Sequence, residues 1–173
     1  MSVKLSGPML PPSSGGMPRQ VVVLLHGYGA DGNDLIALGM QWRGQLPDAL
    51  FVAPNAPQPC AVGPFGYQWF ALDLDAPHLW AEGAAVARET LLAFLTELWR
   101  QTGLSARNTI LAGFSQGAMM ALNVGLSLPE APLGIVAFSG ALIAPEGFEQ
   151  GQWARPPVCL VHGVDDGVVP MEA

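Results

Sequence analysis

The sequence has few charged residues: only 12% of its 173 residues are charged, and 14 acidic against 7 basic side chains give a net charge of −7. Lys and Arg form no cluster, so nucleic acid is not an expected partner. No apolar run reaches the roughly 18 residues that a membrane span needs. Proline and glycine interrupt residues 1–20 before the apolar core of a signal peptide could form, so we expect a cytoplasmic location.

Cysteine is also scarce. Cys60 and Cys159 are the two cysteines, and neither has a second metal-type ligand at short spacing. The sequence therefore gives no expectation of a bound metal. We interpret both thiols as reduced structural residues, with a disulfide between them left open. Half of the residues are apolar, which at this length predicts one globular domain over residues 1–173.

Short apolar runs alternate with longer amphipathic stretches along the chain. The runs of strand length are Val21–Leu25, Leu50–Ala53, Thr109–Ala112, Gly134–Phe138 and Val158–Val161. They lack alternating polar residues, which predicts parallel strands buried on both faces. Helices are expected over Asp34–Leu46, Ala81–Arg100 and Gln116–Leu128. This order predicts an α/β fold, a mostly parallel sheet between helices in three layers. Residues 1–19 are expected to be loop-like, with room for one short edge strand.

Polar motifs follow three of the predicted strands, at the end where α/β sheets bind ligands. They are HGYG at 26–29, GFSQG at 113–117 and HGVDD at 162–166. GFSQG fits the G-x-S-x-G nucleophile elbow, in which the serine occupies a tight strand-to-helix turn. Glycines two residues before and after Ser115 would prevent collisions with neighbouring strands. The alternative is that Ser115 caps an ordinary helix.

The HGYG motif lies in a glycine-rich stretch, LLHGYGADGND, at residues 24–34. Acyl transfer needs two backbone N–H groups aimed at an oxyanion, and we expect them from Gln116 and from Tyr28 or Gly29. We interpret His26 as a structural hydrogen-bonding residue rather than a base. Neither a following Lys-Ser/Thr nor a G-x-G-x-x-G pattern is present, which disfavours nucleotide binding. Three polar residues are expected to cap the next helix: Asp31, Asn33 and Asp34.

A carboxylate after a late strand is the expected acid of a serine–acid–histidine triad. Asp165 and Asp166 both have suitable spacing, and neighbouring side chains cannot both face one histidine. His162 is expected to be structural. The alternative for this segment is a simple Asp-Gly turn.

These motifs, together with YQWFALDL at 67–74, resemble the bacterial carboxylesterase and acyl-protein thioesterase group of α/β-hydrolases, the phospholipase/carboxylesterase family. The resemblance implies an α/β-hydrolase fold and hydrolysis of short or medium acyl esters, with thioesters and lysophospholipids as further substrates of some members. It implies small-molecule substrates, no cofactor, and a homodimer as a common state. The implied roles are nucleophile for Ser115, acid for Asp166, oxyanion hole for Tyr28 and Gln116, and substrate binding for Trp69 and Phe70.

Two positions depart from the family pattern. Tyr28 stands where the family often has leucine, a change that a backbone donor tolerates. Ala71 follows the Trp-Phe pair where aspartate is usual, in a loop that lines the acyl site. Substrate preference is therefore the property that the resemblance leaves most open.

The triad histidine should follow Asp166, but GVVPMEA contains none. The family histidine lies about thirty residues further on, after one more strand and before a final helix. We therefore expect a chain cut short before that strand and helix, with trace esterase activity at most. In such a chain Val158–Val161 would be an exposed apolar edge, which favours aggregation or strand exchange. The alternatives are a base at His26 or His78, or a non-catalytic hydrolase-like binding protein.

Overall fold

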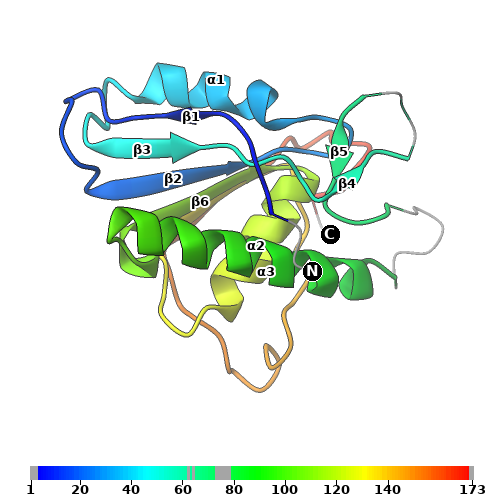
Figure 1. Ribbon diagram of the computed structural model, residues 1–173. Helices are drawn as coiled ribbons and strands as arrows, with labels where there is room; N and C mark the ends of the chain where they lie inside the picture. The colour runs from blue at the N-terminus through cyan, green and yellow to red at the C-terminus, as the bar shows by residue number, and fades with distance from the viewer. Residues whose placement is uncertain (1–3, 62, 64, 73–78, 172–173) are drawn as a thin grey trace.

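A six-stranded sheet forms the centre of the computed structural model, which describes residues 4–61, 63, 65–72 and 79–171 (Figure 1). Its strands in spatial order are β1 (Met9–Leu10), β3 (Ala49–Val52), β2 (Gln20–Leu25), β6 (Thr109–Phe114), β7 (Gly134–Phe138) and β8 (Val158–Val161). β1 is antiparallel to β3, and every other pair is parallel. The mostly parallel sheet is therefore confirmed, and β1 is the short edge strand expected near the N-terminus.

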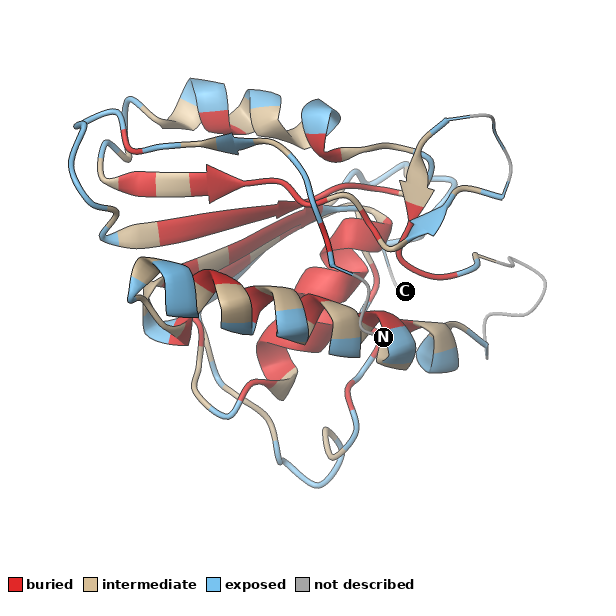
Figure 2. Ribbon diagram, in the orientation of Figure 1, coloured by how far each residue is buried: buried red, intermediate tan, exposed pale blue. Residues whose placement is uncertain are grey.

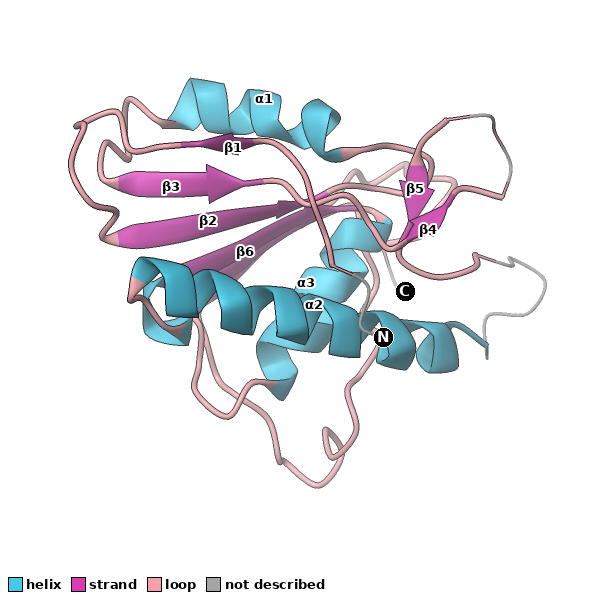
Figure 3. Cartoon of the chain, in the orientation of Figure 1, coloured by secondary structure: helices cyan, strands magenta, loops and turns pink. Residues whose placement is uncertain are grey.

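Helices cover both faces of the sheet, as Figures 1 and 3 show. α1 (Gly32–Trp42) lies on one face, and α2 (Trp80–Thr102) and α3 (Gln116–Ser127) lie on the other. This confirms the three-layer arrangement. Of the helices in the described residues, none is both long and apolar enough to cross a membrane.

The start of α1 shows how the sequence sets a boundary. The Asn33 N–H donates to the Asp31 side chain at 2.7 Å, and the Asp31 N–H donates to the Asp34 side chain at 2.9 Å. This reciprocal capping box confirms the expected cap and begins the helix at Gly32, two residues before the predicted start. Capping residues lie inside the first turn as well as before it, so their sequence positions bracket the start without fixing it.

A small hairpin was not expected from the sequence. β4 (Gln58–Pro59) pairs antiparallel with β5 (Tyr67–Gln68). Strands of only two residues carry no measurable periodicity, so the sequence offered no signal for them. The hairpin matters because Tyr67 exchanges two backbone hydrogen bonds with the residue 29–30 loop, at 2.9 and 2.8 Å.

The most deeply buried part of the molecule is the layer formed by the central strands and α3 (Figure 2). Every residue of α3 from Gln116 to Leu126 is buried, because the helix packs against both the sheet and α2. A helix that is apolar on all sides is stable only in such a position. The nucleophile candidate therefore begins the best-protected helix of the fold.

β8 departs from the predicted pattern. Its apolar sequence predicts burial on both faces, yet all four of its residues are exposed, Leu160 by 69%. Burial on both faces is therefore wrong for β8, whereas the exposed apolar edge expected for this segment is confirmed: β8 is an edge strand, and no described helix or strand packs on its outer side. Its neighbour β7 keeps Ile135 and Ala137 buried against α3.

We expect a 173-residue polypeptide to self-associate through β8, because an exposed apolar edge strand is a template for pairing. Leu160→Lys should shift the polypeptide toward monomer in size-exclusion chromatography with light scattering. Val164→Lys is the matched control, since Val164 is 78% exposed but lies in the loop after the strand. Equal effects of the two substitutions, or a wild-type monomer at all concentrations, would contradict pairing through this edge.

Candidate active site

Ser115 occupies a sharp turn between β6 and α3. Its backbone has φ 52 and ψ −117, a left-handed conformation that is uncommon for a residue with a side chain. Its N–H donates to the Phe138 carbonyl at 2.8 Å, which ties the turn to the end of β7. Its side chain is half-buried, while α3 behind it is fully buried. The local geometry is that of the expected nucleophile elbow.

The flanking glycines are required by close backbone packing. A methyl group on Gly113 would overlap the Gly117 carbonyl, and one on Gly117 would overlap the Leu25 carbonyl at the end of β2. These contacts match the reason for the G-x-S-x-G spacing. They also bring the first turn of α3 directly against the glycine-rich loop that follows β2.

That loop lies beside the serine. A methyl group on Gly27 would come within 3.5 Å of the Ser115 Cβ. Gly29 cannot supply an oxyanion donor, because its N–H donates to the Tyr67 carbonyl at 2.9 Å. The Tyr28 N–H has no acceptor among the described residues, and Gln116 begins a helix whose first N–H groups lack intrahelical partners. Tyr28 is therefore the better candidate of the two loop positions, opposite Gln116.

The Tyr28 side chain is half-buried near the β4–β5 hairpin. Loss of hydration and an interaction with the Cys60 thiol raise the pKa of Tyr28 above its ordinary value, at which the phenol is already neutral at physiological pH. Both cysteines are free thiols, as the reduced interpretation predicts.

Trp69 and Phe70 are 0% and 1% exposed. The Trp69 N–H donates to the Gln116 Oε1 at 2.8 Å, and the Gln116 Nε2 donates to the Phe70 carbonyl at 2.8 Å. The Trp69 indole N–H donates to the His26 carbonyl at 3.0 Å. All these contacts are within the protein, so the substrate-binding role of the pair remains a prediction.

His26 is completely buried and both of its ring nitrogens are used. Nε2 accepts from the Ala56 N–H at 2.9 Å, so the proton lies on Nδ1, which donates to the Gly27 carbonyl at 2.8 Å. Loss of hydration lowers the pKa of His26 and keeps the ring neutral. Its contacts are those of a structural residue, as the sequence suggested.

Asp166 is held more firmly than its neighbour Asp165. Its Oδ1 accepts from the Val169 and Val168 N–H groups at 3.0 and 2.9 Å. These two bonds are the main reason that the pKa of Asp166 is lowered, so the group is a carboxylate at neutral pH. Asp165 is exposed, and the turn closes with the Asp166 N–H on the Gly163 carbonyl. The segment forms a turn and also presents the Asp166 carboxylate, so the two interpretations made from the sequence are compatible.

Sequence reasoning missed Ser139, the residue after β7. Its φ is 48, its N–H donates to the Val161 carbonyl at 2.9 Å, and its hydroxyl contributes to lowering the pKa of Asp166. The carboxyl ends of three adjacent strands are thus followed by Ser115, Ser139 and Asp166. β6 and β8 lie two strand spacings apart, about 10 Å. A polar residue directly after the apolar run GIVAF was the available signal.

The described histidines are not placed to fill that gap as they stand. His26 is occupied as above, and the His162 Nε2 contacts the Val169 carbonyl at 2.7 Å, with the Asp166 Oδ2 3.7 Å away. His78, the other base considered from the sequence, lies outside the described residues.

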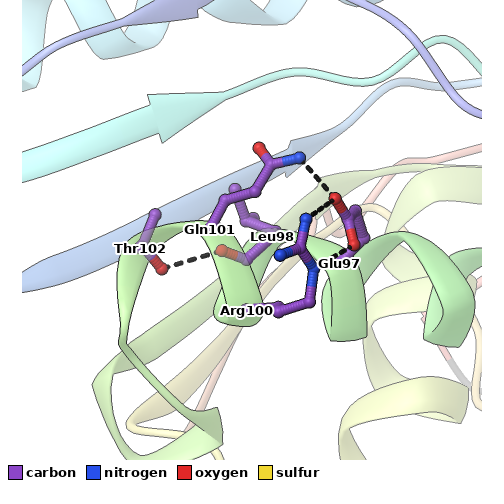
Figure 4. A network of polar contacts seen from close by, with 5 residues as sticks. All are labelled: Glu97, Leu98, Arg100, Gln101 and Thr102. Atoms are coloured by element: carbon purple, nitrogen blue, oxygen red, sulfur yellow. Dashed lines mark hydrogen bonds and ion pairs between the residues drawn. The ribbon is translucent and has the colours of Figure 1, made fainter.

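Two cavities lie away from Ser115. One of about 590 Å³ is bounded by the N-terminal segment, β3 and α2, and another of about 350 Å³ by α2 and the loop before β8. Glu97, at the edge of the first, accepts hydrogen bonds from Arg100 and Gln101 (Figure 4), which lower its pKa to about 2. Its carboxylate is already engaged and offers no site. No cluster of three or more metal-ligating side chains occurs within the described ranges.

A parallel sheet with a strained serine between its central strand and a buried helix defines the α/β-hydrolase fold. The family model for Phospholipase/Carboxylesterase matches residues 12–173, and the chain belongs to this family. The crystal structure of esterase PE8 superimposes with a TM-score of 0.93 at 57% identity, covering 98% of this chain and 80% of that chain.

Curated relatives are more distant. Esterase YpfH of Escherichia coli is 29% identical over 153 residues, which cover 87% of this chain and 63% of YpfH. Acyl-protein thioesterase 1 of Emericella nidulans is 28% identical over 173 residues, covering 87% of this chain and 71% of that protein. The chain thus spans less than two thirds of the length of YpfH.

The first prediction from the site concerns His26 and pH. In the unfolded chain His26 takes up a proton below about pH 6.5, whereas the folded ring resists protonation until its lower pKa is reached. Between these values the free energy of unfolding should fall with decreasing pH, by up to about 1.4 kcal/mol per pH unit from this residue. Urea denaturation from pH 8 to pH 5 measures this slope. His26→Gln should flatten it, and an unchanged slope in the variant would show that other groups cause it.

The second concerns the anchoring of the acid. Asp166→Ala removes the acceptor of the Val168 and Val169 N–H groups, so exchange of these two amides should accelerate by about 10-fold or more. Asp165→Ala is the matched control and should leave both rates unchanged. Hydrogen exchange followed by NMR measures the two amides. Equal acceleration in both variants would mean that the loop is held by other contacts.

Proposed function

We propose that the chain is a serine hydrolase of carboxylic esters and acyl thioesters that acts through an acyl-serine intermediate. The Ser115 Oγ attacks the acyl carbonyl carbon, and the alcohol or thiol leaves with a proton. Water then hydrolyses the acyl-serine and restores the hydroxyl. The N–H groups of Tyr28 and Gln116 bind the negative oxygen of each tetrahedral intermediate. Asp166 orients the imidazole that moves the protons.

One observation carries this proposal: Ser115 is held at φ 52 beside a loop whose Tyr28 N–H has no acceptor among the described residues. Backbone strain at a polar residue is retained where the surrounding structure enforces it, and such positions cluster at active sites. An ordinary helix cap requires an extended backbone and a side-chain hydrogen bond to the first turn, and Ser115 has neither. The names of the relatives, esterase and acyl-protein thioesterase, support ester or thioester substrates.

The proton acceptor is the incomplete part of the proposal, since His26 and His162 are engaged elsewhere. We therefore propose that proton removal limits the reactivity of Ser115 in the 173-residue polypeptide. The observed arrangement would still supply an oxyanion hole and a fixed nucleophile. A cytoplasmic location remains a prediction from the sequence, with which the two free thiols are compatible.

A fluorophosphonate probe tests the nucleophile. We expect labelling of the Ser115 Oγ, identified by peptide mass spectrometry, and none in Ser115→Ala. Added imidazole should accelerate labelling by about 10-fold or more, since a mobile base replaces a positioned one. Ser127→Ala is a control at the other end of α3. Absence of labelling with imidazole would leave a non-catalytic binding protein as the function. Rapid labelling without imidazole that His78→Ala abolishes would instead assign the base to His78.

Substrate class follows from a second assay. Short-chain p-nitrophenyl esters and a palmitoyl thioester should be compared under the conditions that give labelling. Faster turnover of the esters places the activity with the carboxylesterases, and faster turnover of the thioester places it with the thioesterases.

A further inference from the structure

We propose that the Gln116 carboxamide is a positioning group for acyl transfer, distinct from the backbone N–H of the same residue. It fixes the Trp69–Phe70 segment against the elbow and so holds the two oxyanion donors in register. This role rests on the proposed function, because it is defined by its effect on the reactivity of Ser115.

The Gln116 side chain makes two hydrogen bonds to consecutive backbone groups. It accepts from the Trp69 N–H and donates to the Phe70 carbonyl, each at 2.8 Å, and its exposure is 0%. Both ends of the amide are therefore used, and the orientation of the amide is fixed by its partners. A residue directly after the proposed nucleophile is thus locked to a segment 46 residues earlier in the chain.

From Trp69 the contacts continue to the oxyanion loop. The indole N–H donates to the His26 carbonyl at 3.0 Å, and the indole ring lies 5.7 Å from the His26 ring. The peptide that follows His26 leads to Gly27 and Tyr28. Gln116 thus fixes the Trp69–Phe70 segment, and Trp69 in turn fixes the start of the loop that carries the Tyr28 N–H.

A second connection between α3 and the loop runs through the backbone. Gly117 packs on the Leu25 and His26 carbonyls with no room for a methyl group, so α3 and the loop touch on this side as well. Gln116 lies between the two contacts with the loop, the one made through Trp69 and the one made by Gly117. If its amide is lost, the Trp69 N–H and Phe70 carbonyl become buried groups without partners, and the segment must move to satisfy them. Such a movement shifts the Tyr28 loop relative to the Gln116 N–H.

Two substitutions separate this role from simple packing. Gln116→Met keeps the length of the side chain and removes both hydrogen bonds. Gln116→Glu keeps both when its carboxyl is neutral, as the carbonyl accepts from Trp69 and the hydroxyl donates to Phe70, but repels the Phe70 carbonyl when ionised. Asn123→Leu is the matched control, because Asn123 is a second buried amide on α3 whose Nδ2 donates to the Ile143 carbonyl at 2.8 Å, away from the loop.

The experiment is the kinetics of fluorophosphonate labelling of Ser115, in imidazole, at a series of probe concentrations and pH values. We expect Gln116→Met to lower the maximal labelling rate by about 10-fold or more with little change in the probe concentration for half-maximal rate. Gln116→Glu should approach the wild-type rate as pH falls. Wild type is measured at each pH, because His26 contacts the Trp69 ring and Tyr67 and titrates on the acid side. Asn123→Leu should label as wild type does.

Several results would overturn the positioning role. They are a wild-type labelling rate in Gln116→Met, equal losses in Asn123→Leu and Gln116→Met, or a Gln116→Glu rate that keeps a constant ratio to wild type at all pH values. Should Gln116→Met fail to fold, the pH dependence of Gln116→Glu decides alone. Failure of the proposed function is recognised separately, as a wild-type Ser115 that does not label, and it removes both proposals.

Discussion

The site depends on one close approach: the first turn of α3 packs directly on the carbonyl groups at the end of β2. Only glycine fits at position 117 for this reason, and Gly113, near the end of β6, has no room for a methyl group against the Gly117 carbonyl. With both neighbours fixed, Ser115 has no extended conformation available and takes a positive φ. The half-buried Ser115 side chain, the adjacent loop and the buried helix all follow from that contact.

Most of the layer order was readable from the sequence, because long apolar runs and amphipathic stretches carry strong periodic signals. The range Gly134–Phe138 was predicted without error, and Thr109–Ala112 is two residues short of β6. For β8 the range was right, but its composition alone predicted burial on both faces, and the exposed edge was expected only from the position of the strand in the fold. The sequence of β8 shows only that its residues are apolar. Their burial depends on which element packs beside the strand, and that is decided when the sheet assembles.

The site was predicted less completely, for a related reason. Ser115, Gln116 and Asp166 belong to motifs contiguous in sequence, so their positions could be named. The contacts around them join residues far apart in the chain, such as the hydrogen bond from the Trp69 N–H to the Gln116 amide. Hydrogen-bond partners at such separations leave no local pattern. Likewise, the sequence shows that Trp69 and Phe70 are aromatic but not that they are completely buried in the main core cluster.

The main chain and the side chains of this site are suited to different tasks. In the proposed site, Tyr28 and Gln116 offer backbone N–H groups to an oxyanion, while their side chains contact Cys60 and the Trp69–Phe70 segment. Under that proposal, a change of side chain at position 28 would alter the surroundings of the substrate and keep the backbone donor.

The exposure of β8 also means that the two ends of the site are packed unequally. Ser115 is anchored between a central strand and a fully buried helix, whereas Asp166 extends from a strand with no buried residue. Because restraint on displacement depends on the packing around a group, we expect the Asp166 carboxylate to move more than the Ser115 hydroxyl. The distance between the proposed nucleophile and the proposed acid would then depend on how firmly the outer edge of the sheet is supported.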